Sequence, residues 1–236
     1  MARVARRRIV SATGYGDLIS SFVLVVPLLL AYDLGVLLSS TINGADFITR
    51  GMLALCGHQR LPYLVMHASI AIVFLMWLHR SGRQRTWSID VALPMIVEAA
   101  VYALTLGAAV SLVVHNVLGL GVRATHGVIQ AVVAALGAGV HEELVFRLGL
   151  FAGGAALLRH LGASPRLAWI CALIISSLAF AAAHHLGIYG EAWSLDVVAF
   201  RTLAGIAFAA IFWYRSFAHV VYAHVLYDLY VTLVAN

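Results

Sequence analysis

Residues 141–147 read His-Glu-Glu-Leu-Val-Phe-Arg and lie between two long apolar runs. Their three formal charges would be costly in lipid unless they face a protein interior or a water-filled cavity. In a helix, Glu143 and Arg147 have the i,i+4 spacing and order that favour a side-chain ion pair. No oppositely charged residue lies three or four positions from Glu142. The stretch therefore predicts a helix that faces a protein interior, with either a purely structural ion pair or a glutamate suited to general base catalysis.

The composition is that of an integral membrane protein with several spans. Of the 236 residues, 63% are hydrophobic and 11% are charged. The net charge of +5 comes from arginine alone, because the chain has no lysine. These arginines gather between apolar runs, so they indicate membrane topology and no nucleic-acid partner. Two cysteines, Cys56 and Cys171, are too few for a disulfide framework or a cysteine-based zinc site.

Residues 1–124 are predicted to form an N-terminal membrane region with three spans and one interfacial segment. The spans are expected at about 18–39, 61–78 and 91–114. Residues 42–60 mix polar and apolar side chains in the pattern of an amphipathic segment at the membrane surface. Asp33 and Glu98 fall inside predicted spans, so we expect both to face protein.

Residues 125–236 are predicted to form the catalytic membrane core. The apolar run 125–160 is longer than one span needs, so we expect a break at Gly137 and Gly139. An interfacial or re-entrant piece would precede the break, and a span from about 139 to 158 would follow it. Further spans are expected at 167–183, 195–214 and 217–235. The predicted fold is therefore an all-α, polytopic transmembrane helix bundle with about seven spans.

Clusters of arginine predict the orientation in the membrane. They occur in residues 1–8, 80–85 and 159–166, which the positive-inside rule places in the cytoplasm. The N-terminus is then cytoplasmic and the C-terminus lies outside. A chain without lysine but rich in alanine, arginine, glycine and valine is typical of a GC-rich genome, so we expect a bacterial inner membrane.

The later spans carry further ionisable residues. His184 and His185 end the fifth span, and Arg201 lies on the sixth. His224 and Asp228 lie one helical turn apart on the seventh, so their side chains share a face. A lone histidine in an apolar helix is usually only a packed bundle residue. Ionisable positions on several helices instead predict one cavity shared with the 141–147 stretch.

Two motifs in this region resemble those of a known family. A double glutamate followed by an arginine four residues after the second is present as Glu142, Glu143 and Arg147. A Phe-x-x-x-His motif is present as Phe180 and His184. Their order and spacing across separate helices make the resemblance specific.

The third motif of that family is His-x-x-x-Asn, matched here by His224 with Asp228 in place of asparagine. The family is the CPBP or Abi family of intramembrane endopeptidases, which includes the type II CAAX prenyl endopeptidases. The resemblance covers about residues 125–236. Segments of the N-terminal region vaguely resemble the members proposed to act as sorting proteases, such as the myxosortases.

The resemblance implies hydrolysis of a peptide bond by a glutamate-activated water. Glu142 would be the general base, and His184 would help to hold the water. The Glu143–Arg147 pair would fix the surroundings of the base, and His224 would stabilise the oxyanion. The resemblance also implies a site without a cofactor or metal.

Asp228 departs from the family pattern, because an ionised carboxylate repels an oxyanion where asparagine would donate to it. Asp228 is then either protonated, or it orients His224 and keeps it cationic. We favour the second alternative.

Other functions fit the same residues. Glu142, His184, His224 and Asp228 contain the two histidines and a carboxylate of a catalytic zinc site. The ionisable residues also suit an ion-coupled transporter, although no inverted repeat is evident. A non-catalytic immunity or scaffold protein with the same motifs is a further alternative.

The predicted orientation favours one class of substrate. A span that begins near residue 139 outside the cell places Glu142 in the outer half of the bilayer, together with His184 and Asp228. An outward-opening site suits a membrane-anchored protein or peptide whose C-terminal tail is removed after export. A CAAX-type enzyme that faces the cytoplasm is the alternative.

Overall fold

The computed structural model describes residues 18–39, 47–80, 88–113, 127–186, 190 and 192–233. Within these ranges the chain is helical and has no β-strand, which confirms the predicted all-α class. In chain order the helices are α2 (Leu18–Ser39), α3 (Phe47–Leu55), α4 (Arg60–Arg80), α5 (Ile89–Val113), α6 (Val128–Gly137), η3 (Ala138–Gly153), α7 (Gly154–His160), α8 (Pro165–Ala183), α9 (Leu195–Tyr214) and α10 (Phe217–Leu233).

Most of these helices are long and apolar enough to cross a membrane. In the described part of the chain six stretches meet that condition, namely Leu18–Leu38, Arg60–Arg80, Ile89–Ala109, Val128–His160, Pro165–Ala183 and Leu195–Tyr214. Helix α10, with 17 residues, is at the short end of the length that can span a bilayer. The chain is therefore an integral membrane protein with a polytopic helical bundle.

The predicted spans agree closely with these helices. The spans expected at 18–39 and 195–214 coincide with α2 and α9. Short polar residues start two of the later helices, since the Ser164 hydroxyl accepts from the Leu167 amide and the Ser194 hydroxyl accepts from the Val197 amide. The segment predicted at the interface contains α3, a short helix that buries Thr49.

The predicted break at Gly137 and Gly139 is wrong. Helices α6, η3 and α7 form one continuous helix of 33 residues, Val128–His160. From Ala138 to Gly153 its backbone hydrogen bonds follow the π-helical i→i+5 pattern, which often marks a functional site. Glu142 consequently lies near the middle of a continuous helix, and the expectation that it begins a span is wrong too.

The two glycines allow close packing with neighbouring helices. A Cβ atom on Gly137 would lie 2.5 Å from Cε2 of the Tyr32 ring on α2. A Cβ atom on Gly139 would lie 2.3 Å from Cγ2 of Val225 and 3.0 Å from the Val221 carbonyl oxygen on α10. Glycine at these positions therefore brings two helices close to the helix that carries the charged stretch.

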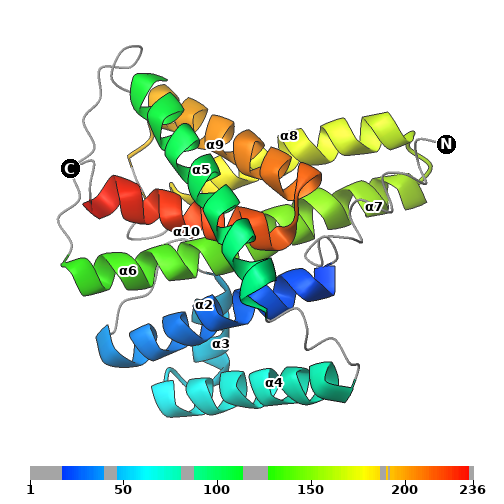
Figure 1. Cartoon of the computed structure of the whole chain (residues 1–236). Coiled ribbons are helices and arrows are strands. Elements are labelled where there is room, and N and C mark those ends of the chain that lie inside the picture. Colours follow the sequence, from blue (N-terminus) through cyan, green and yellow to red (C-terminus); the bar gives the residue numbers. More distant parts are fainter. Residues whose placement is uncertain are drawn as a thin grey trace.

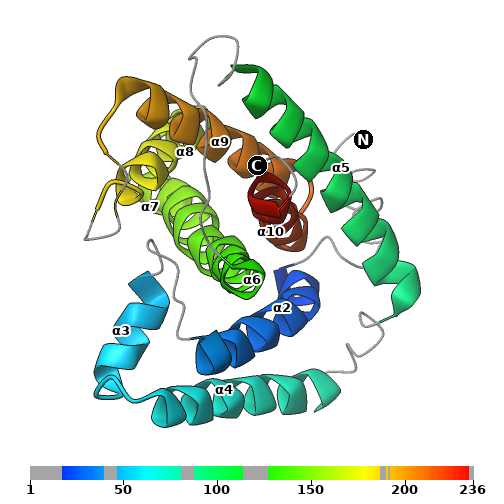
Figure 2. The ribbon, with the colours of Figure 1, turned by 90° about the vertical axis from the view of Figure 1, so that its left-hand side faces the viewer.

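Helix α10 lies at the centre of the bundle. Figure 2 shows it nearly end-on, with α2, α5, α6 and α9 around it, and it packs against each of them and against η3. Apart from two buried histidines, its inward residues are small or apolar, and Ala218, Val220, Val221 and Ala223 are fully buried. The histidine motif on α10 is thus held in the interior of the protein.

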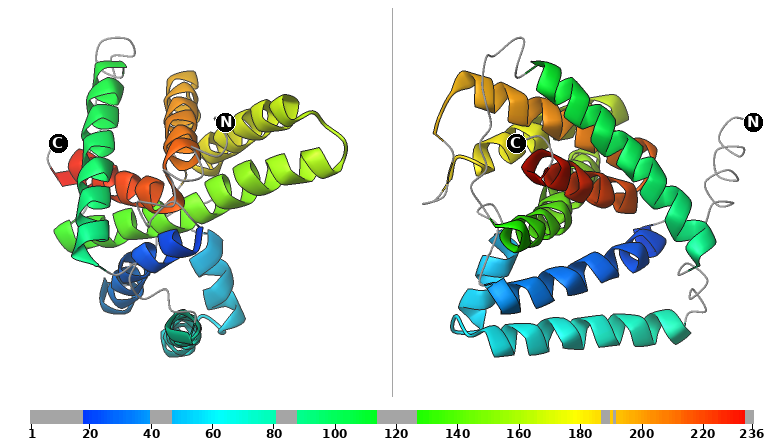
Figure 3. Two further views of the ribbon diagram at one scale, coloured as in Figure 1. Left: turned by 45° about the vertical axis from the view of Figure 1, so that its right-hand side comes forward. Right: turned by 60° about the vertical axis from the view of Figure 1, so that its left-hand side comes forward.

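Helix α4 lies at the edge, with α2 between it and α6 (Figures 1 and 3). Most of its side chains are exposed, as expected for a surface in contact with lipid. It is joined to α2 by polar contacts, because Asp33 accepts hydrogen bonds from the Tyr63 hydroxyl at 2.9 Å and from His67 Nδ1 at 2.7 Å. Asp33 faces protein, as predicted.

Glu98 on α5 also faces protein groups. It forms an ion pair with Arg215, which follows α9, and its Oε2 atom lies 3.4 Å from His219 Nε2 on α10. These contacts hold the turn between α9 and α10 against α5. This cluster lies at the opposite end of α10 from Asp228.

Several sequence predictions lie outside the described residues. They concern the arginines at positions 3, 6, 7, 8, 83 and 85, residues 42–46, and the end of the last predicted span beyond residue 233.

Candidate active site

The charged stretch forms a buried ion pair within η3. Arg147 Nε lies 3.1 Å from Glu143 Oε2, and both side chains are almost completely excluded from solvent. The two residues have the i,i+4 spacing predicted from the sequence. Ionised groups in such a place need partners on every side, because an uncompensated buried charge is strongly destabilising.

Residues from two other helices surround the Arg147 guanidinium. Its Cζ atom lies 4.3 Å from the centre of the Phe180 ring on α8 and 5.3 Å from that of Phe208 on α9. A guanidinium between aromatic rings gains cation–π attraction, which is greatest where water is excluded. Its Nη2 atom also donates to the Gly205 carbonyl oxygen of α9 at 3.5 Å. Arg147 therefore links η3 to α8 and α9.

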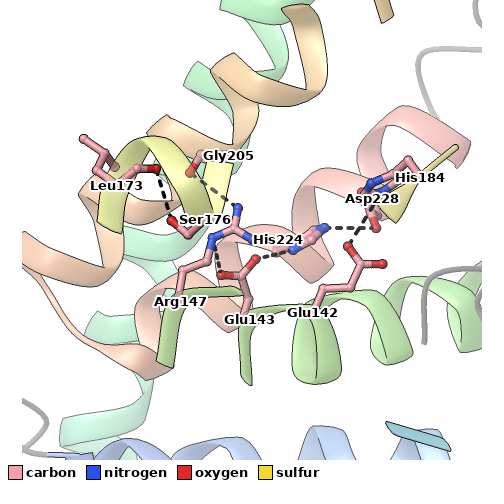
Figure 4. A network of polar contacts seen from close by, with 9 residues as sticks. All are labelled: Glu142, Glu143, Arg147, Leu173, Ser176, His184, Gly205, His224 and Asp228. Carbon is pink, nitrogen blue, oxygen red and sulfur yellow. Dashed lines mark hydrogen bonds and ion pairs between the residues drawn. The ribbon is translucent and has the colours of Figure 1, made fainter. Parts of the chain in front are cut away.

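His224 on α10 contacts the second oxygen of Glu143. Its Nδ1 atom donates to Glu143 Oε1 at 2.6 Å (Figure 4). The Phe208 ring stacks on the imidazole, with centroids 4.4 Å apart and planes 19° apart. On the other side of the ring, His224 Nε2 lies 3.6 Å from Asp228 Oδ2. His224 is thus held between two carboxylates.

Glu142 faces His184, which follows the last residue of α8. Glu142 Oε2 lies 3.7 Å from His184 Nε2. His184 Nδ1 lies 2.8 Å from the Phe180 carbonyl oxygen, which can only accept, so the proton of a neutral ring is on Nδ1. Burial and the positive charge of Arg201 lower the pKa of His184 to about 3, so its ring is neutral near pH 7. Its Nε2 atom therefore presents a lone pair towards Glu142.

One side of the cluster is open. The side chains of Glu142, Glu143 and His224 are 4% exposed or less, whereas His184 is 13% and Asp228 is 27% exposed. The exposed edge of the cluster therefore lies at His184, after the end of α8, and at Asp228 on α10.

The residues do not fit a zinc ion. In the described ranges, no group of three or more histidine, cysteine, aspartate or glutamate side chains has a geometry that could hold a metal. His224 Nδ1 donates to Glu143, and this proton would have to be lost before that nitrogen could bind a metal. We therefore derive no chemical step through a metal.

The structure brings predicted residues from η3, the end of α8 and α10 into one cluster, Glu142, Glu143, Arg147, His184, His224 and Asp228 (Figure 4). His185, the other histidine at the end of the fifth predicted span, stacks on the Trp193 ring with centroids 4.4 Å apart. The sequence motifs do not include Phe208, although Arg201, Gly205 and Phe208 have the spacing of one helical face.

These features define an integral membrane protein with a buried, ionisable site inside its helical bundle. Residues 124–230 match the family described as Rce1-like, type II CAAX prenyl endopeptidase. This match supports a relation of the segment to the CPBP/CAAX protease family, and it supports an intramembrane CAAX-type endopeptidase. No curated protein and no solved structure matches the chain.

Removing either member of the buried ion pair is expected to destabilise the protein. Arg147→Ala and Glu143→Ala should each lower the free energy of unfolding by about 3–5 kcal/mol, because each leaves a buried charge without its partner. Thermal denaturation in detergent measures the effect. Arg215→Ala is the matched control, because its ion pair with Glu98 is partly exposed and should contribute about 1 kcal/mol or less. Equal losses for Arg147→Ala and Arg215→Ala would contradict the buried pair.

Proposed function

We propose that the protein is an intramembrane endopeptidase in which Glu142 and His184 activate a water molecule. The observation that carries this proposal is the facing pair of acceptors, Glu142 Oε2 and His184 Nε2, 3.7 Å apart. Two acceptors so close repel each other unless a donor lies between them. A water molecule has two protons to donate, one to each atom, and this arrangement aims its lone pairs away from both.

The proposed reaction needs only residues of the cluster. The water oxygen attacks the carbonyl carbon of the substrate peptide bond, and Glu142 accepts the proton that the water loses. Glu142 then gives this proton to the leaving nitrogen as the C–N bond breaks. The products are a new carboxylate and a new amine, so no oxidant, metal or cofactor is required.

His224 is proposed to stabilise the oxyanion. The carboxylates of Glu143 and Asp228 on either side favour an imidazole that is protonated on both nitrogens. The Nε2 proton is fixed in the plane of the ring, and because Asp228 Oδ2 is 3.6 Å away, this proton can be donated to an oxyanion on the exposed side of the site. Asp228 thus orients His224 and keeps it cationic, the role of the carboxylate beside the histidine in other hydrolases.

Replacing the proposed base should abolish hydrolysis and leave the fold intact. Glu142→Gln keeps the shape of the side chain but cannot accept a proton, so turnover should fall at least about a hundredfold. The assay uses purified protein in lipid nanodiscs and an internally quenched peptide that ends in a farnesylated Cys-aliphatic-aliphatic-X motif. Exported substrates are tested by C-terminal proteomics, which compares the protein C-termini in membranes that contain wild-type or Glu142→Gln protein.

Asp90→Asn, an exposed carboxylate at the start of α5, is the control and should have wild-type turnover. Substantial hydrolysis by Glu142→Gln at normal protein levels would end the proposal that Glu142 is the base.

The role of Asp228 has its own test. Asp228→Asn restores the residue of the family motif but removes the negative charge beside His224 Nε2. If Asp228 keeps His224 cationic, turnover should fall about tenfold or more with unchanged thermal stability. Turnover equal to or above that of the wild type would show that Asp228 only occupies the position of the asparagine.

We propose that the site opens towards the cell exterior and processes C-terminal tails or anchors of exported proteins. With Arg159 and Arg166 in the cytoplasm, α8 ends outside at His184, α9 begins outside, and α10 ends outside. His184 then lies at the outer end of α8, and Arg201 and Asp228 lie in the outer halves of their helices. This argument does not depend on the broken helix that the sequence suggested.

Labelling with a membrane-impermeant thiol reagent tests the orientation. In a chain without Cys56 and Cys171, we expect intact cells to label Leu195→Cys at the start of α9. Leu161→Cys, in the turn between α7 and α8, should react only after lysis. Both side chains are largely exposed, at 88% and 71%, so access across the membrane decides the result. The reverse pattern would return a CAAX-type enzyme that faces the cytoplasm to first place.

A further inference from the structure

His141 directly precedes the proposed base and contacts helices on the other side of η3 from α8 and α9 (Figure 2). Its side chain is buried, with 3% exposed. Its Nδ1 atom lies 3.3 Å from the Thr49 hydroxyl on α3. The Tyr32 ring on α2 meets the imidazole edge-on, with centroids 5.1 Å apart. His141 is therefore held by two helices that precede the family-matched segment 124–230.

Tyr32 holds the same helix one turn earlier. Its ring packs against Gly137, where a Cβ atom would come within 2.5 Å, and Tyr32 itself is completely buried. Gly137 and His141 are four residues apart, so both lie on the face of the helix that meets α2. Tyr32 thus contacts this face over one full turn.

Further side-chain contacts connect α2 to α4 and α4 to α3. Asp33, next to Tyr32, accepts from His67 Nδ1 on α4 at 2.7 Å. The other ring nitrogen of His67 lies 3.1 Å from Met52 Sδ on α3. Met52 and Thr49 are three residues apart on one face of α3. A closed circuit of side chains therefore links α2, α4 and α3 and ends on His141.

This circuit fixes the rotation of the helix that carries Glu142. Successive side chains leave a helix at a fixed angle to each other, so a side chain anchored at position 141 sets the direction of its neighbour at 142. The direction matters because Glu142 must face His184, which lies on another helix, at 3.7 Å. A small rotation of η3 would move the carboxylate away from the place where the water is proposed to bind.

We propose that Thr49 and His141 are positioning residues for Glu142, and that helices α2–α4 thereby complete the active site of the peptidase. This inference rests on the proposed role of Glu142 as the base. It extends the functional unit beyond the family-matched segment, because Thr49, Tyr32, Asp33 and His67 all precede residue 124.

The test compares Thr49→Val with Thr49→Ser. Valine has nearly the shape of threonine but has no hydroxyl, whereas serine keeps the hydroxyl. One hydrogen bond corresponds to about a threefold to tenfold change in rate, so Thr49→Val should lower kcat for the farnesylated peptide by about that factor with unchanged KM. Thr49→Ser should restore kcat. His141→Phe, which keeps the contact with Tyr32, should act like Thr49→Val, and the double variant should be no worse than either.

A second readout needs no substrate. The infrared carboxylate band of Glu142 is isolated as the difference between wild-type and Glu142→Gln spectra in nanodiscs. Thr49→Val and His141→Phe should shift or broaden this band, and Thr49→Ser should not. The control is Thr105→Val on α5, whose exposed hydroxyl donates only to its own helix, at the Val101 and Tyr102 carbonyls. It should change neither the band nor kcat.

An unchanged Glu142 band in folded Thr49→Val and His141→Phe protein would overturn the positioning role. The positioning role would also be overturned if Thr49→Val and Thr49→Ser lost the same thermal stability and this loss explained the whole decrease in kcat. Full turnover by Glu142→Gln would instead contradict the proposed function. The infrared spectra of the Thr49 variants would still show whether the contact between Thr49 and His141 affects the Glu142 carboxylate. The two failures are therefore distinguishable.

Discussion

The two oxygens of Glu143 hold the bundle in one arrangement. Oε2 lies 3.1 Å from Arg147 Nε in the same helix, and Oε1 accepts from His224 Nδ1 of α10 at 2.6 Å. A carboxylate with no exposed surface is stable only while both partners are in place. Since α10 also packs against α2, α5, α6 and α9, the position of η3 relative to the other helices depends on this residue.

Arg147 carries the same constraint to α8 and α9. Its guanidinium meets the rings of Phe180 and Phe208 and the carbonyl of Gly205. Glycine allows a close approach at that point, because a Cβ atom on Gly205 would lie 3.1 Å from Ser177 Cα. The close approach of α8 and α9 around Arg147 places the end of α8, with His184, opposite Glu142.

The sequence predicts contacts within a helix better than contacts between helices. The pairs Glu143–Arg147 and His224–Asp228 follow from the helical period alone, as do the ends of most spans. The contact of Phe208 with His224 depends on how α9 crosses α10, which no local pattern records. Gly137 and Gly139 show the reverse error, because local reasoning treats glycine as a helix breaker. In the folded protein they are places where Tyr32 and Val225 pack closely.

Glu142 and Glu143 are chemically identical neighbours with different surroundings. They leave the helix in different directions, so that Glu142 meets His184 and Glu143 meets Arg147 and His224. In the proposed mechanism, the fixed Glu143 therefore supports its neighbour while Glu142 exchanges a proton. Asp228 brings one more negative charge than the asparagine of the family motif. In the proposed charge state, three carboxylates are balanced by Arg147, Arg201 and a cationic His224, so this aspartate leaves no uncompensated charge in the membrane.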